Sequence, residues 1–173
     1  MNIILLIHRF IELKPKNMTL DKIDLAILRL MQENSRISNI HMAKELEMAP
    51  SAVLERVKKL EQKNVIMQYT ARIDPVAVDL KLLAFISMRT SNTVGCTTTA
   101  DELAQIKEVQ EVHIVAGEDC YLVKVRTTDS ASLMALMRDS FSKISNILSV
   151  RTTIVLETVK EQQQLIIPEN PTK

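Results

Sequence analysis

The spacing of apolar residues changes from a helical period to a strand-like period near residue 80, and this change is the strongest constraint on the fold. Between Leu20 and Lys63, apolar side chains recur at steps of three and four, as on one face of a helix. Beyond residue 80, short runs such as 111–116 have the alternation that is typical of strands. The chain is therefore predicted to contain a helical unit followed by a mixed α+β unit.

The helical half has the element order of a helix-turn-helix. Asp21 is placed to cap a first helix whose apolar stripe ends at Met31, and Ser38 precedes a short second helix. Pro50 opens a third helix at the first helical position, where its missing N–H costs nothing. Because only 47–49 separate the second and third helices, this half is expected to form a helix-turn-helix DNA-binding domain.

The third helix is expected to pack through Leu54, Val57 and Leu60, with Val53 flanking this stripe. The run 65–73 that follows is rich in β-branched residues and predicts a strand or hairpin, serving as a wing or linking strand. The helical half is therefore predicted to be a winged helix-turn-helix.

The second half predicts the order β-α-β-β-α-β of a ferredoxin-like domain. Its second helix is capped by Asp129 or Ser130 and carries an apolar stripe up to Ile144. The other predicted elements are strands at 82–88, 112–116, 120–126 and 150–159 and a helix at 101–107. Two helices would cover one face of the sheet, so a partner is expected to cover the other face.

Composition excludes several kinds of site. The only two glycines, Gly95 and Gly117, are too far apart for a dinucleotide fingerprint or a P-loop. The two cysteines, Cys96 and Cys120, have neither CxxC spacing nor a nearby histidine pair, so no zinc site or disulfide framework is predicted. No apolar run approaches the roughly 18 residues that span a bilayer. We therefore expect no metal, no cofactor and no membrane partner.

Two stretches resemble the leucine-responsive regulatory protein/AsnC family. Residues 20–75 resemble its DNA-binding half, and the segments VQEVHIVAGEDCYLVKVRTTD (109–129) and VRTTIVLETVK (150–160) resemble its effector-binding half. The resemblance implies a transcription regulator of the bacterial or archaeal cytoplasm that binds double-stranded DNA. It also implies homodimers built through the ferredoxin-like sheets, often assembled into octamers, with an amino acid bound between effector domains.

The resemblance also divides the chain. It implies a helix-turn-helix domain with its linking strand at 19–74 and an effector-binding and oligomerisation domain at 75–161, followed by a tail at 162–173. Residues 1–18 lie outside it, and Met18-Thr19-Leu20-Asp21 looks like a natural start. We therefore interpret 1–18 as an extension that is either not native or disordered.

The outward face of the third helix is the main candidate for contact with DNA. Ser51 and Ala52 lie at the end that would meet base edges, and Arg56 is suited to a bidentate pair with guanine. Glu55 is suited to accept from cytosine or to pair with Lys59. The alternative is a solvated helix face with ordinary ion pairs. The candidate DNA-binding residues are Ser38, Pro50, Ser51, Ala52, Glu55, Arg56, Lys59, Lys63 and Arg72.

The resemblance places an amino-acid effector at the turn that begins with Gly117. Glu118 and Asp119 are suited to accept hydrogen bonds from an effector ammonium, and a solvated turn is the alternative. Thr152 and Thr153 are expected to line the same pocket, although threonine is also a good strand former. The candidate effector-binding residues are Gly117, Glu118, Asp119, Cys120, Thr152 and Thr153.

Besides the extension at its start, the sequence departs from the family pattern at three residues. Glu47 stands where the turn usually has glycine, and a non-glycine residue at positive φ costs about 1 kcal/mol. Ala49 stands where a serine usually caps the third helix, and such a loss costs about 1 kcal/mol. Cys120 replaces the second acidic residue of the effector turn. Glu47 and Ala49 leave open a metabolite-binding module that no longer binds DNA. Siroheme decarboxylases resemble the same family, so a decarboxylase-like enzyme is the other alternative.

Overall fold

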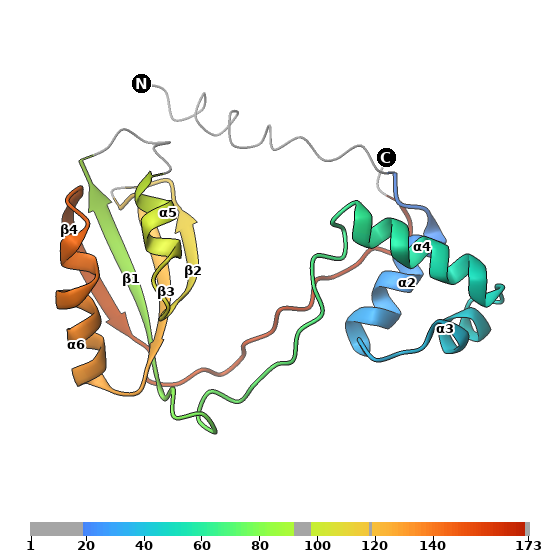
Figure 1. The fold of residues 1–173 in the computed structure, drawn as a ribbon, viewed down its shortest axis with the longest axis horizontal. Coiled ribbons are helices and arrows are strands. Elements are labelled where there is room, and N and C mark those ends of the chain that lie inside the picture. Colours follow the sequence, from blue (N-terminus) through green and yellow to red (C-terminus); the bar gives the residue numbers. More distant parts are fainter. Residues whose placement is uncertain (1–18, 92–97, 118, 172–173) are drawn as a thin grey trace. The chain divides into compact units, whose positions relative to one another are not determined.

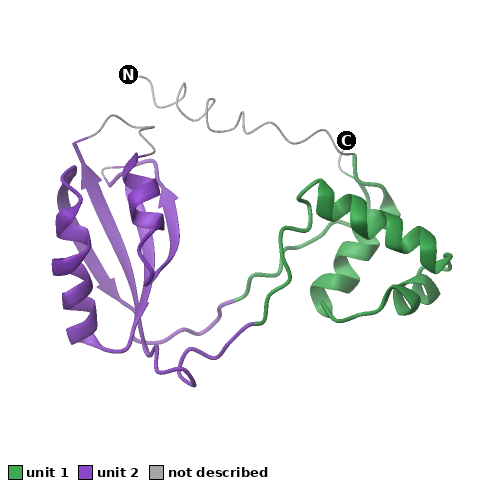
Figure 2. Ribbon diagram, in the orientation of Figure 1, with its two compact units in different colours: residues 1–71, 162–173 green, residues 72–161 purple. Residues whose placement is uncertain are grey.

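The computed structural model describes residues 19–91, 98–117 and 119–171. The chain divides into two compact units, residues 1–71 with 162–173 and residues 72–161 (Figure 2). The extension predicted at 1–18 lies outside the described residues. The segment predicted as a separate tail at 162–173 belongs by its contacts to the first unit.

The described part of the first unit contains three helices: α2 (Lys22–Glu33), α3 (Asn39–Glu45) and α4 (Pro50–Gln62) (Figure 1). Asp21 caps α2 in a capping box with Asp24, in which each side chain accepts from the other residue's backbone N–H. The hydroxyl of Ser38 caps α3 by accepting from the His41 N–H at 3.1 Å. The buried core of the first unit comprises Ile27, Met42, Ala43, Val53, Val57 and Leu60.

The turn between α3 and α4 has the features expected from its sequence. Glu47 adopts a positive φ of 53°, the region that favours glycine. The Met48 N–H closes the turn on the Ala43 carbonyl oxygen at 2.8 Å. Ala49 precedes α4 without a side-chain cap, and Pro50 takes the first helical turn. This turn is therefore held by backbone contacts and core packing.

The predicted inward stripe of α4 was wrong at Leu54. This side chain is 39% exposed, whereas Val53, Val57 and Leu60 are buried. Residues four and three apart share a helix face, and Leu54 is rotated by about 100° from Val53. Val53 therefore takes the core position that the sequence analysis assigned to Leu54.

The strand predicted at 65–73 does not form in this chain. Val65 and Ile66 pack against the helical core and donate their N–H groups to the Leu60 carbonyl oxygen. The Tyr69 hydroxyl donates to Glu61 at 2.8 Å, and burial together with this carboxylate raises the pKa of Tyr69 to about 12. A strand requires a second strand to satisfy its backbone groups, and no strand in the described part of the chain pairs with this segment.

The second unit is the predicted ferredoxin-like βαββαβ domain. Its antiparallel sheet has the order β2-β3-β1-β4, which places β1 and β3 at the centre. The elements are β1 (Leu82–Thr90), α5 (Thr98–Ala104), β2 (Val109–Ile114), β3 (Tyr121–Thr127), α6 (Ser130–Asp139), a 3-10 turn (Phe141–Lys143) and β4 (Ile147–Ile154). Asp129 caps α6 through the Ser132 N–H, as one of the two predicted candidates.

The last strand ends earlier than predicted. Its pairing with β1 stops at Ala84 and Ile154, and beyond this pair the Val155 N–H still donates to the Leu83 carbonyl oxygen at 2.9 Å. Leu156 and Val159, which the prediction placed in the strand, are 98% and 91% exposed. The apolar character of these two residues could not show at which residue β1, the partner strand of β4, begins.

Helices α5 and α6 lie on one face of the sheet (Figure 1). Beneath them, the core is filled by alternate strand residues, including Ile86, Met88, Val123 and Val125. The register places the other residues on the opposite face, which we call the outer face. Its pairs are Phe85 with Lys124, Ser87 with Leu122, Phe85 with Thr153, Ser87 with Arg151, Glu111 with Lys124, and His113 with Leu122.

Residues after 161 bind to helix α2 within the first unit. Gln32 holds Leu165 in both directions: its Nε2 donates to the Leu165 carbonyl oxygen at 2.7 Å, and its Oε1 accepts from the Leu165 N–H at 2.9 Å. Gln164 donates to the Gln32 carbonyl oxygen, and Arg29 donates to the Pro168 carbonyl oxygen at 2.8 Å. The end of the chain is therefore part of the helical unit, which its sequence did not indicate.

Candidate nucleic-acid interface and effector region

Helix α4 presents an exposed polar face. Ser51, Glu55, Lys59 and Lys63 are exposed, and Ala52 is half-buried. Among the described residues, neither Lys59 nor Lys63 forms an ion pair, and the predicted alternative pair of Glu55 with Lys59 is not formed. Two ammonium groups without a carboxylate partner are available to an anionic ligand such as the DNA backbone.

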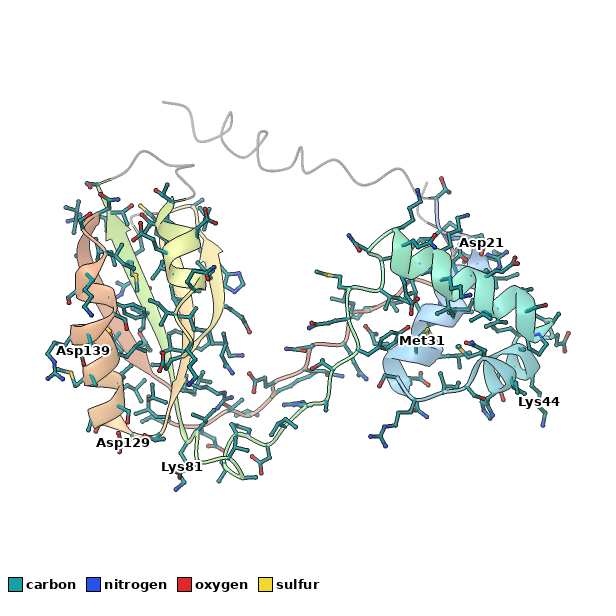
Figure 3. The ribbon with its side chains drawn as sticks, in the orientation of Figure 1. Asp21, Met31, Lys44, Lys81, Asp129 and Asp139 are labelled. Atoms are coloured by element: carbon teal, nitrogen blue, oxygen red, sulfur yellow. The ribbon has the colours of Figure 1, made fainter. Side chains whose placement is uncertain are left out.

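Arg56 lies near Ala52, Lys59 and Lys63 around the helix, but it is bound by two carboxylates. Its Nη1 donates to Asp21 Oδ2 and to Asp24 Oδ1, both at 2.7 Å. Figure 3 labels Asp21 within the helical unit. The Arg56 side chain is 29% exposed, and that of Asp24 only 8%. The guanidinium predicted to read a guanine is therefore engaged with the start of α2.

These contacts shift the pKa values of both partners. Burial opposes ionisation of Asp21, but the Asp24 N–H and the Arg56 guanidinium lower the pKa of Asp21 below its ordinary value. The hydrogen bonds to Asp21 and Asp24 raise the pKa of Arg56. The three side chains therefore form a charged cluster that links α4 to α2.

Two further predicted DNA contacts have other surroundings. The Ser38 hydroxyl oxygen accepts from the His41 N–H as a helix cap. The hydroxyl proton of Ser38 can still be donated to another acceptor. Arg72 belongs to the second unit, where its Nη2 lies 3.9 Å from Glu161 Oε2, and its side chain is 72% exposed. Arg72 therefore does not belong to the unit that contains α4.

The predicted effector turn is tied to strand β4. Asp119 Oδ2 accepts from Arg151 Nη2 at 2.6 Å. An added Cβ at Gly117 would meet no atom within 4 Å, and its φ lies outside the left-handed region, so neither close approach nor backbone strain requires this glycine. Glu118 lies outside the described residues. Cys120 is a half-buried free thiol that packs against the sheet core.

The two candidate threonines do not share a pocket. Thr152 pairs with Ile86 and faces the helix layer, whereas Thr153 pairs with Phe85 on the outer face. Successive strand residues point to opposite faces of a sheet, so the prediction that both line one site was wrong. Arg151 pairs with Ser87 and shares the outer face with Thr153. The sequence analysis missed Arg151, although its position two residues before Thr153 is the signal that places them together.

The outer face also carries an ion-pair network that the sequence analysis missed. Lys124 Nζ donates to Glu111 Oε1 at 3.0 Å and to Glu161, and Arg126 Nη2 donates to Glu161 Oε2 at 2.9 Å. The hydrogen bond from Lys124 lowers the pKa of Glu161, and that from His113 lowers the pKa of Glu111. The sequence did hold a signal for this network. Titratable residues lie two apart at 111 and 113 and at 124 and 126, and residues two apart in a strand lie on the same face.

The described part of the chain has neither a metal site nor a helix that could span a membrane. Within the described ranges, no group of three or more histidine, cysteine or acidic side chains is arranged to hold a metal ion. None of the helices in the described part of the chain is long and apolar enough to cross a bilayer.

Family models match both units. A model of the Lrp/AsnC ligand binding domain matches residues 83–165, and a model of a winged helix-turn-helix DNA-binding domain matches residues 20–67. The leucine-responsive regulatory protein of Haemophilus influenzae is 34% identical over 158 residues, which cover 89% of this chain and 94% of that protein. The protein of the same name from Escherichia coli K12 is 32% identical over 152 residues, covering 86% and 92%.

Solved structures of regulators have the same fold. A transcriptional regulator from Neisseria meningitidis, in complex with L-Met, matches with a TM-score of 0.78 at 29% identity, covering 86% of this chain and 97% of that one. A feast or famine regulatory protein from M. tuberculosis, complexed with L-methionine, matches with a TM-score of 0.78 at 32% identity, covering 86% and 99%.

These relatives support a regulator over the decarboxylase-like alternative, because the relatives named here are described as regulatory proteins or transcriptional regulators. Both halves of the resemblance are confirmed, each by its own family model and in the predicted order. The chain belongs to the Lrp/AsnC family of DNA-binding transcriptional regulators.

Proposed function

We propose that this regulator reads double-stranded DNA with helix α4 in the major groove. Ser51, Ala52 and Glu55 would meet base edges, and Lys59 and Lys63 would bind phosphates. The exposed face of α4, whose two ammonium groups have no carboxylate partner among the described residues, is the observation that carries this assignment. The alternative of a module without DNA binding gives no reason for this arrangement.

Three other candidates have supporting roles in this proposal. Ser38 lies at the N-terminus of α3 and Pro50 at the N-terminus of α4. Because the N-terminus of a helix favours anions, we assign both positions to the phosphates of DNA. We assign Arg72 to phosphate as well, since its guanidinium is exposed and its contact with Glu161 is long.

We further propose that the effector is an amino acid such as L-methionine, bound beside the 117–120 turn. Two structural relatives are described as complexes with this amino acid. Asp119 would accept from the effector ammonium, and Thr153 would lie on the same outer face as Arg151. Gly117, Glu118 and Cys120 would line the turn, and Thr152 would contribute from the opposite face only through its backbone.

A homodimer through the outer face of the sheet, assembling further to an oligomer such as an octamer, completes the proposal. Phe85 and Leu122 are half-buried apolar side chains on this face, and a second copy would cover them. Two α4 helices in a dimer would meet half-sites about one helical turn of DNA apart. We assign the protein a regulatory rather than a catalytic role. We place it in the bacterial or archaeal cytoplasm, where chromosomal DNA lies.

Selection from a randomised double-stranded DNA library tests the reading helix. The affinity of the full-length protein for the enriched duplex is then measured between 50 and 200 mM salt. Each phosphate contact contributes about 0.9 to the slope of log affinity against log salt, so Lys59→Gln and Lys63→Gln should each reduce the slope by about that amount. Lys107→Gln, an exposed lysine of the second unit, is the matched control. A protein that enriches no sequence would contradict the proposal in favour of the metabolite module.

A further inference from the structure

One nitrogen atom of Arg56 connects two helices of the DNA-binding unit. Nη1 lies 2.7 Å from Asp21 Oδ2 and 2.7 Å from Asp24 Oδ1. These two carboxylates already satisfy the first turn of α2, because each accepts from the other residue's N–H. Arg56 therefore binds a rigid acceptor pair, and Asp24 is only 5% exposed.

The start of α4 lacks two features that normally fix a helix end. No side chain caps its first turn at Ala49, and the preceding turn includes Glu47 at a φ of 53°. Core packing of Val53, Val57 and Leu60 sets which face of α4 is buried, and Arg56 adds a polar contact to it. A charged hydrogen bond is directional, so Arg56 constrains how α4 is rotated on α2.

This rotation decides which side chains α4 presents. Ser51 and Glu55 lie on the exposed face, and Arg56 follows Glu55 directly, about 100° around the helix. If the contact to α2 were lost, the reading face could turn relative to the rest of the unit. Base contacts are sensitive to such displacements because each depends on hydrogen-bond geometry.

We propose that Arg56 is a positioning residue of the DNA-reading helix: its contact with Asp21 and Asp24 orients α4, and it reads no base itself. This inference rests on the assignment of α4 as the reading helix. It replaces the guanine contact that the sequence alone suggested for Arg56.

Asp21→Asn separates the two roles by the sign of its effect. Asparagine keeps the helix cap but removes one of the two carboxylate charges that hold Arg56, and Asp24 retains the other. A positioning role predicts that the affinity for the selected duplex falls by about tenfold, the loss of one charged hydrogen bond, although a negative charge has been removed. A base-reading role predicts unchanged or tighter binding, because Arg56 would be released toward DNA.

Arg56→Gln and the double variant complete the cycle. Positioning predicts that Arg56→Gln weakens binding to every single-base variant of the duplex by the same factor and that adding Asp21→Asn causes little further loss. Loss of preference at one base pair only would overturn the proposal. Glu33→Gln, at an exposed acidic residue at the other end of α2, controls for the charge change and should bind as the parent does or slightly tighter.

Thermal unfolding gives a readout that does not need DNA. The two single substitutions should each lower the Tm of the helical unit by about 4–8 °C, with a clearly smaller further drop in the double variant. If the Tm shifts of the two single variants added up in the double variant, the proposed contact of Arg56 with Asp21 would be contradicted. If the parent protein enriches no DNA sequence while the shifts remain coupled, the assignment of α4 as the reading helix fails and the contact between α2 and α4 stands.

Discussion

Asp119 in the turn between β2 and β3 and Arg151 on β4 form an ion pair at 2.6 Å, although 32 positions separate them in sequence. The pair joins the proposed effector turn to the strand that carries Thr152 and Thr153. An α-amino acid carries both opposite charges, so it can replace this pair with two new ones. The two side chains thus present complementary charges at one place.

We predict that Arg151→Gln and Asp119→Asn each weaken L-methionine binding by about tenfold, as expected for one charged hydrogen bond. Methionine amide, which lacks the carboxylate, should be insensitive to Arg151→Gln but still sensitive to Asp119→Asn. Isothermal titration of the full-length protein measures both. Equal effects of Arg151→Gln on the acid and the amide would contradict the role of Arg151.

A serine at position 49 should stabilise α4. Ala49 lies in the extended conformation of an N-cap but makes no side-chain hydrogen bond. Ala49→Ser supplies the missing acceptor and is expected to raise the free energy of unfolding by about 1 kcal/mol. Urea unfolding of the helical unit measures the gain, and Ala77→Ser in an exposed turn should change it little. A loss of stability would show that the hydroxyl does not reach the first-turn N–H groups.

Glycine at position 47 should also stabilise the turn. Glu47 is held at a φ of 53°, where a Cβ is unfavourable by about 1 kcal/mol. Glu47→Gly removes that cost, and the greater freedom of the unfolded chain offsets part of the gain, so we expect an increase below about 1 kcal/mol. Glu55→Gly, in the interior of α4, should instead destabilise by about 1 kcal/mol. The opposite signs separate turn strain from a general effect of glycine.

The network on the outer face should make the second unit sensitive to acid. The folded pKa of Glu161 lies below its ordinary value of 4.5, so the folded state binds fewer protons than the unfolded state. Its stabilising contribution is complete above about pH 4.5 and is lost as the pH falls through the lower folded pKa. Melting temperatures from pH 6 to pH 3 should therefore fall.

Glu161→Gln tests this dependence. Since Glu161 is 30% exposed, solvent screens its pairs, and we expect a loss of about 1 kcal/mol at pH 7. The variant and the parent protein should converge in stability below the folded pKa. Glu157→Gln, an exposed acidic residue in the same segment, is the control. A constant difference at all pH values would mean that the carboxylate charge is not responsible.

Removal of residues 162–173 should loosen α2. The truncated chain loses four hydrogen bonds that link Arg29 and Gln32 to this segment. They are exposed, so together we expect them to contribute about 1 kcal/mol. Amide hydrogen exchange in α2 should speed up in the truncated protein and, to a smaller degree, in Gln32→Ala. Unchanged exchange in both proteins would show that the segment does not support the helix.

The features that were predicted correctly depend on residues that are close together in the sequence. Asp21, Ser38 and Pro50 each act within one helical turn, so their roles could be derived from spacing. The order of the ferredoxin-like strands followed from the alternation of apolar side chains, and each domain's resemblance was carried by a local motif. Such features need no knowledge of the tertiary structure.

The errors concern partners that are distant in sequence. The carboxylates that hold Arg56 lie 35 and 32 positions before it, so no helical spacing could reveal that its guanidinium is occupied. The segment 65–73 has strand-forming residues, but strand formation depends on a neighbouring chain segment that composition does not show. Leu54 differs because the helical period itself places Val53 on the buried face.

The binding of Leu165 and Pro168 to α2 has a consequence for biosynthesis. A ribosome makes the helices of the DNA-binding unit before the sheet, but it makes the residues that bind to α2 only after the sheet. A nascent chain, or one ended by premature termination within the sheet, therefore carries a helix-turn-helix without its final contacts. Full maturation of the DNA-binding unit must wait until the effector domain has been synthesised.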